Sequence, residues 1–199
     1  MNARKILLRT SGYSFVALLC LFSSQAPAAL PAVGGGGYHS VVAKADGTVR
    51  TWGSDIFGEL GAARQLTFST PISVVGVSGI TAVSASSIHS LALKSDGRVF
   101  AWGSNFYGEL GDGSTTNRTA PVAVAGLTGV TAIFAGVYHS VALKSDGTVW
   151  AWGFNGFGQL GDGSRIDRST PVQVSGLTNV GAISAGFNHT LALKRDGTV

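Results

Sequence analysis

Histidine has the widest chemical repertoire of the side chains in this sequence, since imidazole can bind a metal ion or act as a base near neutral pH. The four histidines are His39, His89, His139 and His189, and each is 50 residues from the next. A catalytic or metal site needs groups that converge in one place, whereas a fixed spacing puts one histidine at the same point of each repeated unit. We therefore predict that they are buried structural residues whose ring nitrogens bind backbone groups of their own or the next unit.

Other short motifs do not assemble a site either. Asp112-Gly113-Ser114 and Asp162-Gly163-Ser164 look like the start of calcium loops, but neither supplies ligands at alternate positions or a distal glutamate. The glycine run at 34–37 lacks the Gly-Lys-Ser/Thr of a phosphate loop, and a Ser–His–Asp triad can be drawn in several copies with nothing favouring one. The sequence predicts no catalytic residue, no cofactor and no metal.

A 50-residue repeat explains the histidine spacing. Trp52, Trp102 and Trp152 follow the same interval, as do the Asp-Gly pairs that begin at 46, 96, 146 and 196. Such self-similarity is typical of repeat architectures. It divides the chain into repeats of about 31–80, 81–130, 131–180 and 181–199, the last of them incomplete.

Each repeat is expected to form about four short strands. In the second copy, 89–94 and 99–102 flank Asp96-Gly97, and an Asp-Gly between apolar runs is a strong hairpin signal. A glycine-rich loop follows to about Asn117, then short strands at 121–124 and 130–134. Neither strand face is consistently polar, as expected for sheets that are covered on both sides.

These features predict an all-β fold, a β-propeller with one sheet per repeat. Only 12% of the residues are charged and 29 are glycine, which suits buried sheets joined by tight turns. A β-helix coil is shorter than this repeat, and a sandwich does not require identical copies.

Residues 1–28 are predicted to be a secretory signal peptide. Arg4, Lys5 and Arg9 precede an apolar run from Tyr13 to Phe22, and 26–28 reads Ala-Pro-Ala, the expected order of such signals. Cleavage after Ala28 gives a secreted, periplasmic or cell-surface chain with no membrane segment; a retained anchor is the alternative. The chain has 14 basic and 10 acidic residues, so removing this segment leaves the charges nearly balanced and no basic patch for nucleic acid.

The repeats resemble those of the regulator of chromosome condensation (RCC1) family. The resemblance is carried by 135–143, Ala-Gly-Val-Tyr-His-Ser-Val-Ala-Leu, and by Trp152-Gly153 followed by Gly-Gln-Leu-Gly-Asp-Gly at 158–163. WD40 repeats would have Trp-Asp where this chain has Trp-Gly, and the Gly-Gly of kelch repeats is missing. The resemblance implies a seven-bladed ring, of which residues 29–199 would supply about three and a half repeats as a fragment.

Residues that differ between the repeats are the candidates for binding a partner, since core positions recur. The divergent segments follow each tryptophan, and loop aromatics and arginines often dominate interfaces. Phe57, Tyr107 and Phe157 recur in register and are expected to pack between blades instead. The partner-binding candidates are Phe106, Arg118, Phe154, Arg165 and Arg168.

The sequence favours an exported, non-enzymatic propeller that binds a protein or surface partner through its blade loops. One alternative, implied by the family's founding member, is guanine-nucleotide exchange on a small GTPase. Another is a hydrolase or lyase whose site lies in a part of the protein outside this sequence.

Overall fold

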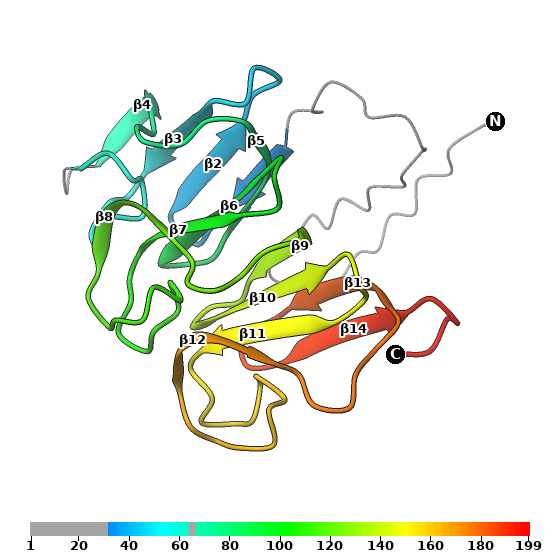
Figure 1. Ribbon diagram of the computed structural model, residues 1–199. Coiled ribbons are helices and arrows are strands. Elements are labelled where there is room, and N and C mark those ends of the chain that lie inside the picture. Colours follow the sequence, from blue (N-terminus) through cyan, green and yellow to red (C-terminus); the bar gives the residue numbers. More distant parts are fainter. Residues whose placement is uncertain (1–31, 64–66) are drawn as a thin grey trace, which may run out of the picture.

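The computed structural model describes residues 32–63 and 67–199, and all regular elements in these ranges are β-strands (Figure 1). The predicted signal peptide lies outside the described residues. No helix in these ranges is long and apolar enough to cross a membrane. In chain order the strands are β1 Ala32–Gly35, β2 His39–Ala43, β3 Val49–Gly53, β4 Phe68–Ser73, β5 Ile80–Ala85, β6 His89–Lys94, β7 Val99–Gly103, β8 Arg118–Ala123, β9 Val130–Ala135, β10 His139–Lys144, β11 Val149–Gly153, β12 Arg168–Gln173, β13 Val180–Ala185 and β14 Thr190–Lys194.

The strands form separate antiparallel sheets in chain order. Three are four-stranded, β1–β4, β5–β8 and β9–β12, and one is two-stranded, β13–β14. We call them blades 1 to 4. The sheets follow one another around a curve from the blue to the red end of the chain (Figure 1). This arrangement confirms the expected all-β, propeller-type fold as a partial ring.

The Asp-Gly hairpins form as predicted. Gly97 has φ +80°, a conformation that only glycine adopts without strain, and its N–H donates to the Lys94 carbonyl at 2.9 Å. The fourth strand of the repeat begins earlier than expected, at Arg118 rather than Pro121. Pro121 is tolerated inside β8 because this strand is the outer edge of its sheet, where a missing N–H breaks no ladder.

The core lies between successive blades. The first strands, β1, β5, β9 and β13, contact one another in sequence, and each second strand also contacts the first strand of the next blade. In the largest apolar cluster, Leu91 and Ala101 of blade 2 pack with Ile133 and Trp152 of blade 3. The stability of each blade therefore depends on its neighbours, as in other repeat proteins.

The connections divide between two faces of the curved stack. The turn before each second strand lies beside the loop after each third strand, since Ser54 N–H donates to the Tyr38 carbonyl and Phe154 N–H to the Tyr138 carbonyl, both at 2.9 Å. We call this the loop face. The Asp-Gly hairpins lie at the opposite ends of the same strands, beside the turns that lead to the next blade, as the Ile80 N–H to Gly47 carbonyl bond of 3.1 Å shows. We call that the hairpin face.

Candidate interaction face

The repeated histidines connect blades through side-chain hydroxyls. Nε2 of His39 lies 2.8 Å from Ser90 Oγ, Nε2 of His89 lies 2.9 Å from Ser140 Oγ, and Nε2 of His139 lies 3.1 Å from Thr190 Oγ1. Each hydroxyl belongs to the next blade. The prediction that the ring nitrogens bind backbone groups was wrong for Nε2, because a serine or threonine stands between the ring and the nearest backbone acceptor.

That backbone acceptor is a loop carbonyl in the same blade as the histidine. Ser140 Oγ donates to the Glu109 carbonyl at 2.8 Å. A hydroxyl that donates its single proton there must accept from His89, so Nε2 of His89 carries the proton and Nδ1 is an acceptor. Ser86 Oγ lies 2.8 Å from that Nδ1 and satisfies it.

The repeated tryptophans use the same carbonyls. Trp102 Nε1 donates to the Glu59 carbonyl, and Trp152 Nε1 to the Glu109 carbonyl, both at 2.8 Å. Both indoles are completely buried, whereas Trp52 is partly exposed in blade 1. One backbone oxygen therefore receives a hydroxyl and an indole from the next blade, which fixes the blades relative to each other.

The buried histidines are poor candidates for acid–base chemistry. Burial lowers the pKa of His39 and His139 to about 4 and that of His89 to about 3. All three are neutral at pH 7 and are engaged by the neighbouring blade. His189, by contrast, is exposed. Within 32–63 and 67–199, no group of three His, Cys, Asp or Glu side chains is placed to hold a metal ion.

The loops after the third strands are held by buried polar side chains. Asn105 Nδ2 donates to Asp112 Oδ1 at 3.2 Å and to the Thr116 carbonyl at 3.1 Å, and its Oδ1 accepts from Leu110 N–H at 2.9 Å. Asn155 makes the corresponding bonds in blade 3. These contacts give the loop face a defined shape.

An ion pair closes each of these loops. Arg118 lies 2.7 Å from Asp112, and Arg168 lies 2.8 Å from Asp162. Burial raises the pKa of Asp162, but hydrogen bonds from Ser164 and Arg168 outweigh it and bring the pKa to about 2. Arg118 and Arg168 thus have a role within the loop, and their proposed contact with a partner stays a prediction.

Aromatic side chains gather on the loop face. Phe57 of blade 1 contacts Phe106 of blade 2 edge-on, with ring centroids 5.9 Å apart. Further contacts join blades 2, 3 and 4, the shortest being 4.8 Å between the rings of Tyr107 and Phe154. We call this set the aromatic row; its members are Phe57, Phe106, Tyr107, Tyr138, Phe154, Phe157 and Phe187.

The aromatic row contains two of the five predicted partner-binding residues. Phe106 is 61% exposed, whereas Phe154 is partly buried between Tyr107 and Phe157. Arg165 is exposed on the same loop of blade 3, and its side chain has no hydrogen bond or ion pair to another described residue.

Of the three recurring aromatics expected to pack between blades, two contact the next blade and the third does not. Phe57 and Tyr107 do contact the next blade, but Phe157 is 68% exposed and contacts Phe154 of its own blade. Tyr138 and Phe187 were missed because they lie in the turns before the histidines, outside the divergent loops. Their aromatic type just ahead of a repeated histidine was the available signal.

Comparison with known proteins agrees with this architecture. The regulator of chromosome condensation (RCC1) repeat matches residues 96–143 and 146–193, and a second profile of the same repeat matches 80–109 and 130–159. No curated protein sequence matches the chain.

Solved structures of similar fold include natural and designed proteins. Prp20p from Saccharomyces cerevisiae is 20% identical, with a TM-score of 0.73 over 80% of this chain and 42% of that one. Human WBSCR16 is 25% identical, with a TM-score of 0.73 over 82% of this chain and 44% of that one. The computationally designed Ika4 protein is 18% identical, with a TM-score of 0.51 over 88% of this chain and 92% of that one. The chain thus spans less than half the length of the two natural relatives.

Proposed function

Because the chain belongs to the regulator of chromosome condensation (RCC1) repeat family, we propose that it is a non-catalytic, protein-binding propeller segment whose aromatic row is the contact surface. The single observation that carries this proposal is the exposure of aromatic side chains, such as Phe106 at 61% and Phe157 at 68%, on a loop face that polar networks hold in place. Aromatic side chains on a fixed scaffold lose little conformational entropy on binding, which is why they are enriched among interface hot spots.

The backbone under the aromatic row is fixed by buried acids. The amide of Tyr107 donates to Glu109 Oε2 at 2.8 Å, and the amide of Phe57 donates to Glu59 Oε2 at 2.7 Å. Glu109 also accepts from Ser104 Oγ at 2.8 Å. These bonds orient the rings before any partner arrives, so the cost of ordering them on binding is small.

Structural relatives support a protein as the class of partner. Prp20p is described by its binding to Gsp1p and histones, and yeast RCC1 (Prp20) is also known bound to Kap60. At 20–21% identity these proteins share the fold with this chain. The likeness does not identify the partner of this chain. The loop that carries Phe154 and Phe157 also presents the exposed Arg165 and Asp167, so the expected partner surface is apolar where it meets the rings and bears charges of both signs at its edge.

We also propose that the protein acts outside the cytoplasm. The support is the order of Arg4, Lys5 and Arg9, the apolar run and Ala26-Pro27-Ala28. Expression of the chain in a secreting host and mass spectrometry of the product test this. A mature N-terminus at Ala29 in the exported fraction is the expected result, and an intact N-terminus in the cytosol would contradict it.

Site-specific photo-crosslinking tests the binding proposal. A photoreactive phenylalanine analogue replaces Phe106 on the loop face or Val75 on the hairpin face; both side chains are exposed, at 61% and 60%. The protein is irradiated in an extract of its source, and the adducts are identified by mass spectrometry. We expect one protein to crosslink from position 106 and not from position 75. Equal crosslinking from both positions would contradict the proposal.

A further inference from the structure

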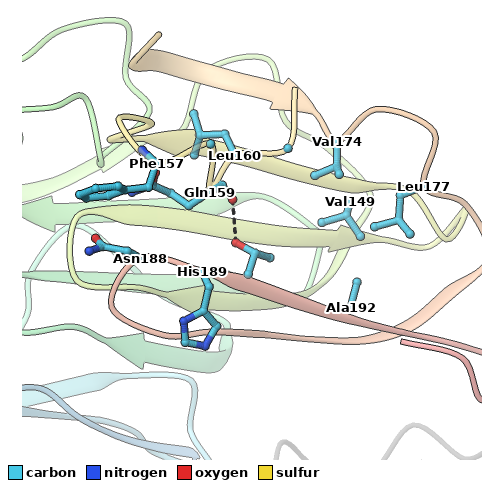
Figure 2. Close-up of a pocket in the computed structure, with 12 residues that line it drawn as sticks. Val149, Phe157, Gln159, Leu160, Val174, Leu177, Asn188, His189 and Ala192 are labelled. Carbon is cyan, nitrogen blue, oxygen red and sulfur yellow. Dashed lines mark hydrogen bonds between the residues drawn. The ribbon is translucent and has the colours of Figure 1, made fainter. Parts of the chain in front are cut away.

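Two pockets of similar size adjoin the junction of blades 3 and 4, and their linings differ in charge. The first, of about 300 Å³, is lined mainly by apolar side chains such as Val149, Leu160 and Val174 (Figure 2), and no lysine or arginine of the described chain lines it. The second, of about 310 Å³, opens on the hairpin face and contains both Lys144 and Arg195. The second pocket is therefore the one whose chemistry suits a negatively charged ligand.

The second pocket forms where the same ends of two blades meet. The strands β10 and β14 run in the same direction (Figure 1), so the residues at their ends lie on the same face of neighbouring blades. The turn that holds Arg195 is closed within blade 4, since Arg195 N–H donates to the Asn179 carbonyl at 2.9 Å. Six residues line this pocket, four from blade 3 and two from blade 4: Thr131, Leu143, Lys144, Ser145, Gly181 and Arg195.

The two lining residues of blade 4 differ from their counterparts in the other blades. Gly181 stands where the second and third repeats have threonine, and Arg195 stands where they have serine. The two residues are also in contact, because a Cβ placed on Gly181 would lie 3.2 Å from Cγ of Arg195. The missing side chain at 181 thus leaves room for the arginine stem. Together the two differences open space at this junction and add a guanidinium to it.

The hydrogen-bond donors of this pocket are largely unused. Arg195 is exposed, and its guanidinium has no hydrogen bond or ion pair to another described residue. Lys144 Nζ lies 3.7 Å from Asp146 Oδ2, beyond hydrogen-bond distance, against 2.7 Å for the corresponding pair in blade 1. The hydroxyl of Ser145 likewise makes no hydrogen bond to a described residue. A guanidinium, an ammonium and a hydroxyl are therefore available to one ligand.

The balance of charge favours a ligand with a single negative charge. Lys144 and Arg195 bring two positive charges to the pocket and Asp146 brings one negative charge beside it, a net charge of +1. Lys194 and Asp196, which flank Arg195 in sequence, cancel each other. A carboxylate matches this balance better than the dianionic form of phosphate. A guanidinium also donates two parallel N–H groups to a carboxylate, which gives the pair a fixed geometry.

We propose that this pocket binds the carboxylate of a small organic monoacid. The carboxylate accepts hydrogen bonds from the Arg195 guanidinium, the Lys144 ammonium and the Ser145 hydroxyl. The apolar body of the acid lies against Leu143, whose carbonyl already accepts from Thr131 Oγ1 at 3.2 Å. The site is on the hairpin face, opposite the aromatic row, so it is separate from the proposed protein contact.

Titration calorimetry of the full chain with hexanoate tests the site. We expect one hexanoate to bind per chain. Hexanamide, which has the same shape without the charge, should bind at least about tenfold more weakly, and inorganic phosphate should also bind more weakly than hexanoate. Failure of hexanoate to bind, equal binding of hexanamide, or tighter binding of phosphate would overturn the proposal.

Two variants restore residues that earlier repeats carry at the same positions, so the fold accommodates them. Arg195→Ser removes the guanidinium and should weaken hexanoate binding by about tenfold or more, and Gly181→Thr crowds the arginine stem and should weaken it by about threefold or more. Arg98→Thr is the matched control, because Arg98 is an exposed arginine on the same face where the other three repeats have threonine. Unchanged affinity in Arg195→Ser, or an equal loss in Arg98→Thr, would overturn the proposal.

Discussion

His89 in blade 2 and Ser140 in blade 3 are 51 residues apart in sequence and 2.9 Å apart in space. The pair continues to the Glu109 carbonyl, which returns the connection to blade 2. Both side chains are completely buried. A buried polar network of this kind specifies one relative position of the blades, because any shift leaves an unpaired polar group.

Ser140→Ala should destabilise the protein by about 1–3 kcal/mol, since it leaves a buried imidazole N–H without an acceptor. Ser40 is the matched control, as it occupies the same repeat position in blade 1 and makes no side-chain hydrogen bond to a described residue. Ser40→Ala should change the free energy of unfolding by less than about 0.5 kcal/mol. Urea denaturation compares the two, and equal losses would contradict the assigned role of the pair.

Stability should fall as the pH drops from about 7 to 5. The folded pKa values of His39 and His139 are about 4, below the ordinary value of 6.5, so between these values the unfolded chain binds more protons. By linkage, each of these histidines lowers the free energy of unfolding by about 2 kcal/mol at pH 5. Burial raises the pKa of Glu109, which opposes this trend.

Denaturation at pH 8, 6 and 5 measures that slope. His89→Gln should flatten the pH dependence, because the pKa of His89 is lowered to about 3 by burial. His189→Gln is the control, since His189 holds the same repeat position but is exposed. If His189→Gln reduced the pH dependence of the unfolding free energy as much as His89→Gln does, the assignment of this dependence to the buried histidines would be contradicted.

Trp152→Ala should cost about 3–5 kcal/mol, because it empties a filled apolar site and removes the donor to the Glu109 carbonyl. Trp52→Ala should cost clearly less, since Trp52 is partly exposed and its indole donates to no described residue. Thermal and chemical unfolding of both variants provide the comparison. Similar losses would mean that the tryptophans do not stabilise the protein through the blade junctions.

Arg168→Ala should destabilise the protein and loosen the loop between β11 and β12. It leaves the Asp162 carboxylate, whose side chain is 6% exposed, without its ion-pair partner, at a cost of about 1–3 kcal/mol. Arg165→Ala is the control and should be neutral for stability. Amide hydrogen exchange across 155–167 reports on the loop, and unchanged protection in Arg168→Ala would contradict this prediction.

The fold could be predicted from the sequence because the repeat supplies the same evidence several times. A single set of histidine, Asp-Gly and tryptophan is weak evidence for a fold. The same residues at a constant spacing of 50 through three copies are compatible with few architectures. The first residue of the fourth strand could not be predicted as well. Proline at 121 suggests a strand start, yet pairing extends back to Arg118 through a register shift between Ala101 and Gly103, which local sequence does not encode.

The site was only partly predictable for a related reason. Divergence between copies pointed to Phe106, Phe154 and Arg165, but it also selected Arg118 and Arg168, whose ion pairs depend on how the loop closes. The next blade's hydroxyl, which stands between each histidine and a loop carbonyl of the histidine's own blade, was missed because its two partners are 51 and 31 residues away from it. Such contacts follow from the stacking of blades and not from the order of residues within one.

The most direct test of the proposed function is the affinity of the crosslinked partner for two alanine variants of the chain. Phe106→Ala removes an exposed ring of the aromatic row, and Val75→Ala removes a comparably exposed side chain on the hairpin face. The proposal predicts at least about a tenfold loss of affinity for Phe106→Ala and an unchanged affinity for Val75→Ala. Unchanged affinity for Phe106→Ala, or an equal loss for Val75→Ala, would contradict binding through the aromatic row.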